Sequence, residues 1–98
     1  MKEQVIKALS FVYDPEIPVN VWELGLIYDI IIKSEDEVEI IMTLTAPNCP
    51  EAESLPYEVK TEIQRITGIQ NVTVTITFDP PWDMNRMSEA AKLELGFL

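Results

Sequence analysis

The N-terminal hydrophobic residues recur at spacings of three and four positions. Over residues 2–13 this spacing predicts a helix with one buried face. The buried face would consist of Val5, Ile6, Leu9, Val12 and Tyr13. Pro15 cannot continue a helix, so we expect the helix to end before it. Residues 14–20 include a second proline, and each proline favours extended geometry in the residue before it. We therefore expect a stiff loop that presents its carboxylates on a fixed backbone.

Alternating apolar and polar residues predict three strands farther along the chain. The first covers residues 26–33, and the polar tetrad 34–37 forms a hairpin turn into the second strand, at 38–45. The third covers residues 71–78. The expected core-facing residues are Leu26, Tyr28, Ile30 and Ile32, then Val38, Ile40, Met42 and Leu44, and finally Val72, Val74, Ile76 and Phe78. The opposite face would be rich in threonine, with Thr43 and Thr45 among its residues.

A second amphipathic helix is expected between the second and third strands, closed by Gly68 as a C-terminal cap. Its apolar stripe consists of Leu55, Val59, Ile63 and Ile66. Pro56 leaves two starts open, because a proline beyond the first turn removes a backbone hydrogen bond. The helix either begins near Pro50 and bends, or it begins near Ser54.

The elements then follow the order helix, strand, strand, helix, strand, helix. The last helix covers residues 89–95 and is capped by Ser88. Helices packed on one face of a small, mixed three-stranded sheet form a two-layer α+β sandwich. With 98 residues and no repeat or linker, the chain is expected to be a single domain over residues 1–98. A sheet this small gains stability by pairing with a copy of itself, which favours a homodimer.

The chain is strongly acidic. It has 17 Asp and Glu residues against 7 Lys and Arg residues and no His, so its formal net charge is -10. Such a surface repels the phosphates of nucleic acids and the anionic headgroups of lipids, and we expect neither as a partner. The N-terminal residues are too polar for a signal peptide, and no stretch approaches the ~18 apolar residues of a membrane span. The single cysteine forms no internal disulfide, which fits a reducing, cytoplasmic setting.

Cys49 is the only thiol, and it lies between the second strand and the second helix. Free N–H groups at a helix start favour the thiolate, which is the form that attacks electrophiles and binds soft metals. The alternative interpretation is an inert, buried side chain, which is the commoner state of a lone cysteine in a small domain. Two features favour function. Cys49 lies in a loop bounded by Pro47 and Pro50, and the chain has no His to act as a ligand.

The chemistry open to this thiol is restricted by what the chain lacks. Covalent catalysis needs an adjacent base, and without imidazole Glu51, Glu53 or Asp14 would have to serve, so we expect no enzyme. An iron-sulfur cluster usually takes about four thiolates, and one chain supplies one. A cluster could be held only between subunits, with carboxylates, a small thiol or a partner protein completing its coordination. Such a labile site suits a transfer protein.

Three neighbouring side chains could support the thiolate. Asp14 and Glu16 flank Pro15 on the stiff loop, although a turn-capping aspartate and a solvated glutamate are the simpler interpretation. Thr45 ends the second strand, where it is either a plain strand residue or a hydrogen-bonding group that orients Cys49.

With these residues in view, the chain resembles the PaaD-like and SufT-like family of metal-sulfur (iron-sulfur) cluster assembly proteins. The resemblance rests on three blocks in the family's order that span nearly the whole chain. They are DPEIP (14–18) with ELGLIY (23–28), TLTAPNCP (43–50), and PPW (80–82) with MSEAAKL (87–93). By resemblance, Cys49 matches the family's characteristic cysteine and Thr45 the threonine before it. Asp14 and Glu16 match the acidic pair of its loop. The family's α+β fold agrees with the one predicted from periodicity.

The resemblance implies an accessory factor that helps place iron-sulfur clusters on recipient apoproteins. Cys49 would be its metal ligand, handling iron or a cluster transiently, and its partners would be iron-sulfur assembly proteins and client apoproteins. PaaD-like members serve an aromatic-degradation oxygenase and often carry a further Cys-rich end, which is missing here, so the general assembly branch is favoured. Two other hypotheses stay open. One is a metal-free adaptor that binds assembly proteins through its acidic surface and Trp82, and the other is a thiol-dependent enzyme.

Overall fold

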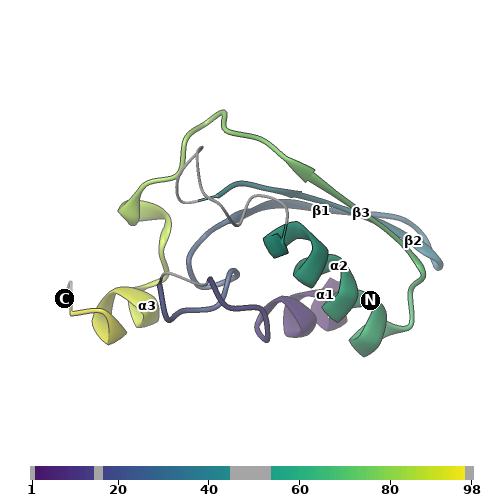
Figure 1. Cartoon of the computed structure of the whole chain (residues 1–98), viewed down its shortest axis with the longest axis horizontal. Helices are drawn as coiled ribbons and strands as arrows, with labels where there is room; N and C mark the ends of the chain where they lie inside the picture. Colours follow the sequence, from purple (N-terminus) through teal and green to yellow (C-terminus); the bar gives the residue numbers. More distant parts are fainter. Residues whose placement is uncertain (1, 15–16, 45–53, 97–98) are drawn as a thin grey trace.

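The computed structural model describes residues 2–14, 17–44 and 54–96, and its elements follow the predicted order (Figure 1). They are α1 (Lys2–Leu9), β1 (Ile27–Ser34), β2 (Glu37–Met42), α2 (Ser54–Thr67), β3 (Asn71–Ile76), the short 3-10 helix η2 (Met84–Arg86) and α3 (Glu89–Glu94).

The strands form one mixed sheet in the order β1-β2-β3. β1 and β2 pair antiparallel, as expected of strands joined by a short turn, and β2 and β3 pair parallel. Parallel neighbours need a crossover connection, which α2 supplies. α1 and α2 lie together on one face of the sheet, whereas α3 lies beyond its end, near the C-terminus (Figure 1). The two-layer α+β fold is therefore confirmed, with α3 outside the helical layer.

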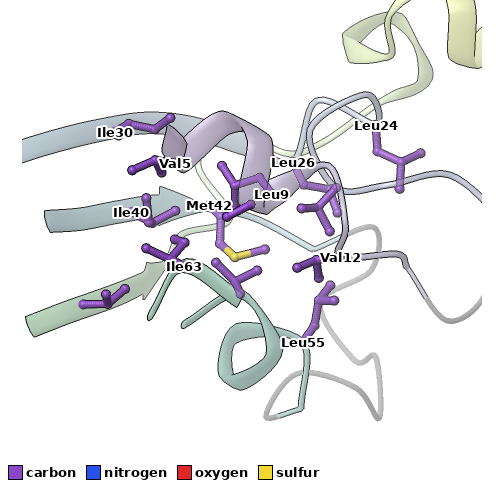
Figure 2. Close-up of a cluster of buried hydrophobic side chains, with 14 of the residues drawn as sticks. Val5, Leu9, Val12, Leu24, Leu26, Ile30, Ile40, Met42, Leu55 and Ile63 are labelled. Atoms are coloured by element: carbon purple, nitrogen blue, oxygen red, sulfur yellow. The ribbon is translucent and has the colours of Figure 1, made fainter. Parts of the chain in front are cut away.

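The core lies between the sheet and these two helices. Val5 and Leu9 of α1 lie over Ile30 and Ile40 of the sheet, and Ile63 enters from α2 (Figure 2). The predicted alternation of β2 is confirmed, because its even-numbered residues are all buried. Full burial of an aliphatic side chain of this size contributes about 1.5–3 kcal/mol, so this layer supplies most of the stabilisation of the fold.

Helix α1 ends at Leu9, short of the predicted end at Tyr13. Tyr13 forms an isolated antiparallel bridge with Asn20, and the Val21 N–H donates to the Val12 carbonyl at 2.8 Å. A residue joined by such a bridge has extended backbone angles, which a helix cannot continue through. Val12 is still buried as predicted, whereas Tyr13 is more than half exposed.

Several predicted side-chain directions are wrong near strand ends. The pairing of β1 with β2 shifts register at both ends of β1, and such a bulge breaks the two-residue alternation. Ile32, expected in the core, is 38% exposed. β3 ends at Ile76, so Phe78 lies beyond the strand and is 43% exposed. Thr43, expected on the polar face, follows the last residue of β2, Met42, and is fully buried.

The helix ends follow local sequence signals. α2 begins at Ser54, one of the two starts that the sequence left open. Pro56 falls in its first turn, where a missing N–H costs no intrahelical bond. Gly68 closes the helix with a φ of 78°, as predicted for a cap. At α3, the Ser88 Oγ accepts a hydrogen bond from the Ala91 N–H at 3.1 Å, which confirms the predicted N-cap.

Candidate functional site

We call residues 14–20 the proline loop, and hydrogen bonds near Asp14 hold its described residues together. Asp14 is 6% exposed, and its Oδ1 accepts a hydrogen bond from the Ile17 N–H at 3.0 Å. Its own N–H donates to the Val19 carbonyl at 3.2 Å, beside the bridge between Tyr13 and Asn20. An aspartate that accepts from the backbone a few residues on stabilises a turn. Asp14 therefore has a structural role in the loop, and its role toward a metal stays a prediction.

Three of the predicted site residues lie outside the described residues. They are Glu16, Thr45 and Cys49. We call residues 45–53 the Cys49 segment, and the structure describes the residues on both sides of it. Leu44 before it and Leu55 after it are 3% and 2% exposed, and both belong to the core. The Cys49 segment therefore connects the buried end of β2 to the buried start of α2.

The chain before the proline loop lies against the first turns of α2. A hollow of about 200 Å³ lies between the residues that follow α1 and the helix α2, and we call it the α1–α2 hollow. It is lined by Phe11, Val12, Tyr57, Glu58, Thr61 and Glu62. Asp14 follows Val12 closely, and α2 follows the Cys49 segment directly. The residues just before Asp14 and the first turns of α2, which follow the Cys49 segment, therefore lie against each other.

Thr43 is a residue that the sequence pattern misplaced, and it directly precedes the core residue Leu44. Its side chain is fully buried, and its Oγ1 has no hydrogen-bond partner in the described part of the chain. Its N–H donates to the Leu26 carbonyl at 2.8 Å, which fixes the backbone just before the Cys49 segment. An unsatisfied buried hydroxyl costs about 1–3 kcal/mol, so it calls for an explanation. The only feature of the sequence that marks Thr43 as a candidate functional residue is its place in the TLTAPNCP block.

Two further motif blocks meet around Trp82. The indole N–H of Trp82 donates to the Leu24 carbonyl at 2.7 Å, and the Tyr28 hydroxyl donates to the Pro80 carbonyl at 2.7 Å. The Arg86 guanidinium lies 4.8 Å from the centre of the Tyr28 ring, a cation–π distance. Trp82 is half-buried against the core, so it covers one end of it.

Gly25 lies in this contact because a side chain does not fit there. Its φ is 76°, in the left-handed region, and an added Cβ would overlap the carbonyl group of Arg86. Close by, the Ser88 N–H donates to the Glu23 carbonyl at 2.8 Å. The segment over residues 80–88 is therefore fixed against the turn that precedes β1.

The charges around the α1–α2 hollow are acidic, because Glu58 and Glu62 line it. Arg65 hydrogen-bonds Glu62 at 2.8 Å, and this bond lowers the pKa of the Glu62 carboxyl. Among residues 2–14, 17–44 and 54–96, no group of three or more His, Cys, Asp or Glu side chains gathers as a metal site would require. No helix in those ranges is long and apolar enough to cross a bilayer.

Sequence comparisons connect the chain to iron-sulfur proteins. The family model described as "Iron-sulfur cluster assembly protein" matches residues 2–76. An Fe-S protein maturation auxiliary factor from Porphyromonas gingivalis is 46% identical over 97 residues, covering 99% of this chain and 92% of that protein. The auxiliary factor SufT of Staphylococcus aureus is 38% identical, covering 87% of this chain and 97% of that protein. An iron-sulfur cluster carrier protein of Synechocystis is 29% identical over 81% of this chain and 22% of the carrier.

Solved structures share the fold. A domain of unknown function from Bacillus anthracis has a TM-score of 0.90 at 32% identity, covering 98% of this chain and 92% of that one. A conserved hypothetical protein from Thermotoga maritima has a TM-score of 0.83 at 42% identity, covering 98% of this chain and 94% of that one. The mixed sheet and its helices are therefore common to these chains over nearly their full length.

Proposed function

The chain belongs to the family of iron-sulfur cluster assembly proteins, and from this premise we propose that it is an accessory factor in the maturation of iron-sulfur proteins. In this role it handles iron or an iron-sulfur cluster as cargo and passes it to recipient apoproteins. The observation that carries the proposal is the position of Cys49. The only thiol of the chain lies in a segment that is flanked by Leu44 and Leu55, and both of these leucines are anchored in the core.

In this proposal, Cys49 supplies the single thiolate that the chain can offer to iron. A cluster usually takes about four thiolates, so the remaining ligands come from a second copy, a small thiol or a partner protein. Borrowed ligands leave readily, which suits transfer and opposes tight retention. The process is ligand exchange at iron, so the chain acts as a carrier and not as an enzyme.

Neighbouring side chains assist Cys49. Asp14 accepts a hydrogen bond from the Ile17 N–H, which stabilises the described part of the proline loop, and Glu16 adds a second carboxylate to the site, as the family resemblance implies. Thr45 orients the thiol through its hydroxyl, as the family resemblance implies. The unpaired hydroxyl of Thr43 is available to hydrogen-bond the Cys49 segment when cargo is bound.

The test is anaerobic reconstitution with ferrous iron, sulfide and a small thiol, followed by visible absorption. The unmodified chain should develop a cluster chromophore, and mixing with an apo-ferredoxin should move that chromophore to the ferredoxin. Cys49→Ser should abolish both signals because it removes the only thiol of the chain. Thr73→Ser, an exposed change on β3, is the matched control and should leave them intact. A chromophore that survives Cys49→Ser would contradict the proposal.

A metal-free adaptor is the second candidate, and the exposed aromatic side chains of the α1–α2 hollow favour it. Phe11 and Tyr57 are 52% and 69% exposed, and exposed aromatics are common anchors of protein interfaces. An adaptor would accelerate cluster transfer from a loaded assembly scaffold to apo-ferredoxin without binding the cluster itself. Acceleration that persists in Cys49→Ser and is lost in Tyr57→Ala would favour the adaptor.

The partners in the leading proposal are iron-sulfur assembly proteins and client apoproteins in the reducing cytoplasm. A homodimer would bring a second Cys49 to the cargo. Sedimentation with and without iron and sulfide tests this part, since cargo-dependent dimers should appear in the unmodified chain and not in Cys49→Ser.

A further inference from the structure

β3 forms one free edge of the sheet, and its sequence is uncharged. In the described sheet β3 pairs only with β2. Residues 71–78 are NVTVTITF, without Lys, Arg, Asp, Glu or Pro. Natural edge strands usually carry such residues, because an unprotected edge is a template for another strand. The sequence of β3 offers no such protection.

Hydrogen bonds at the two ends of β3 determine which backbone groups face outward. The N–H groups of Asn71 and Thr77 donate to carbonyls of the β2 side at 3.3 and 2.9 Å. In a parallel pair every second residue bonds to the neighbouring strand, so the odd-numbered residues of β3 face β2. The N–H and carbonyl groups of Val72, Val74 and Ile76 therefore point away from the sheet. Within the described ranges no other backbone group bonds to them.

A hollow of about 350 Å³ runs beside this edge. It is lined by Pro56, Tyr57 and Lys60 of α2 and by Val72, Thr73 and Val74 of β3. Consecutive strand side chains point to opposite faces, so a hollow lined by three consecutive strand residues follows the edge itself. Tyr57, which is 69% exposed, gives the hollow an aromatic wall, and Lys60 gives it a positive charge.

We propose that β3 binds an extended peptide segment of a partner protein as a fourth strand of the sheet. The outward backbone groups of the even-numbered β3 residues supply its main-chain hydrogen bonds. Side chains of the added strand that point toward α2 enter the hollow, where apolar ones pack on Tyr57 and an acidic one pairs with Lys60. Those on the other face lie beside the threonines of β3, which favours β-branched polar residues.

Charge favours such a peptide over a second copy of this chain. The described ion pairs are Lys33–Glu39 and Arg65–Glu62, so Lys60 has no carboxylate partner within the described residues. A second copy would present its own β3, which has no carboxylate, and would bring both Lys60 residues toward the same seam. A near-neutral strand with one acidic residue avoids both costs.

Strand addition at β3 goes beyond the proposed handling of iron, because it uses no atom of the Cys49 segment. Cys49→Ser should therefore leave peptide binding unchanged. Failure of cluster reconstitution and failure of strand addition are then separate results.

The test is amide hydrogen exchange of the full chain, followed by NMR, with the capped peptide TVTETVT as the probe. In the free chain the amides of Val72, Val74 and Ile76 should exchange faster than those of Thr73 and Thr75. Saturating peptide should slow the first group by about tenfold or more. The same peptide N-methylated at every amide has no N–H group to donate along either edge, and it should give no protection.

Lys60→Glu tests the charge match. It should weaken TVTETVT binding about fivefold and strengthen binding of the variant peptide TVTKTVT by a similar factor. Lys92→Glu, on the distant α3, is the matched control and should change neither affinity. Neither lysine is buried, so we expect both variants to fold. A difference in their affinities for the peptide then reports on the charge alone.

Three results would overturn the proposal. The first is an absence of protection up to the solubility limit of TVTETVT. The second is equal protection by the N-methylated peptide, since strand addition requires the backbone bonds. The third is protection of Val74 in the free chain that grows with protein concentration, which would identify a second copy as the occupant.

Discussion

At Thr43 the folded chain buries a hydroxyl that has no hydrogen-bond partner among the described residues. The backbone at this position is fixed by the bond from its N–H to the Leu26 carbonyl, so the side chain cannot easily turn toward solvent. A buried hydroxyl that gains a partner only when cargo is bound would destabilise the empty protein and favour the loaded one. In the proposed function, Thr43 would thus link local stability to the binding of cargo.

Thr43→Val should raise the free energy of unfolding of the empty protein by about 1 kcal/mol, because valine replaces the unpaired hydroxyl with a methyl group. Thr73→Val, on the exposed face of β3, should change it by less than about 0.5 kcal/mol. Urea unfolding followed by circular dichroism measures both values. A loss of stability in Thr43→Val would show that the hydroxyl already has a partner in the empty protein.

Gly25→Ala should destabilise the chain far more than Gly68→Ala. Both glycines have similar backbone angles, with φ values of 76° and 78°, where a Cβ costs about 1–2 kcal/mol. An added Cβ meets nothing within 4 Å at Gly68, but it overlaps the Arg86 backbone at Gly25. We expect a loss of about 1 kcal/mol for Gly68→Ala and of more than about 3 kcal/mol for Gly25→Ala in urea unfolding. Equal losses of stability in the two variants would mean that the Arg86 backbone moves away from the added Cβ without a loss of free energy.

At the scale of elements, α3 depends on contacts outside itself. It has 6 residues, and isolated helices of that length are unstable in water. Ser88 attaches it in two ways, through the N-cap bond from the Ala91 N–H to its Oγ and through the bond from its own N–H to the Glu23 carbonyl. The indole of Trp82 adds a third attachment, to Leu24. α3 is therefore expected to open as a local unit before the sheet does.

Ser88→Ala removes the side-chain cap and leaves the backbone bond to Glu23 in place. It should lower the stability of α3 by about 1 kcal/mol. Hydrogen exchange should accelerate for the amides of residues 91–95 and stay unchanged in β2. Ser10→Ala, which removes an exposed hydroxyl contact after α1, is the control and should leave the exchange of α3 unaltered. A uniform acceleration over the whole chain would contradict a local opening.

Features set by neighbouring residues were predictable from the sequence, and features set by distant contacts were not. The caps at Gly68 and Ser88 depend on residues within one helical turn, so sequence patterns indicate them correctly. The end of α1 at Leu9 depends on the bridge between Tyr13 and Asn20, which forms across a loop. Propensity and periodicity carry no information about such a bridge.

The candidate site was predictable at the level of segments. The position of the Cys49 segment between β2 and α2 follows from the alternation before it and the amphipathic stripe after it. The burial of Thr43 follows from packing beyond the end of β2, where alternation no longer holds. The bond from Trp82 to the Leu24 carbonyl joins residues 58 positions apart, and no local pattern specifies it.

At the scale of the whole molecule, the net charge of -10 opposes compactness. The radius of gyration is 13.0 Å. The Debye length is about 30 Å at about 0.01 M salt and about 8 Å at about 0.15 M. Carboxylates on opposite sides of the molecule therefore repel one another appreciably only at low salt. The ion pairs Lys33–Glu39 and Arg65–Glu62 lie at the surface, where such pairs contribute little. At low salt, the repulsion among the carboxylates therefore destabilises the fold by more than these two ion pairs stabilise it.

Raising NaCl from about 0.01 M to about 0.15 M should raise the melting temperature of the chain, because it screens this repulsion. Glu58→Lys reduces the negative charge by two units at an exposed position of α2, and its melting temperature should depend less on salt. Thermal unfolding followed by circular dichroism measures both slopes. A melting temperature that falls with added salt would show that attractive pairs dominate.

Leu44 and Leu55 have a consequence for how such a protein can diversify. Both side chains are held in the core, so the chain is anchored on either side of residues 45–53. A relative's stretch could be grafted between the two leucines and bring a different ligand set onto an unchanged sheet. In the proposed function, cargo preference would then evolve within one short insert while selection on the rest of the chain preserves folding.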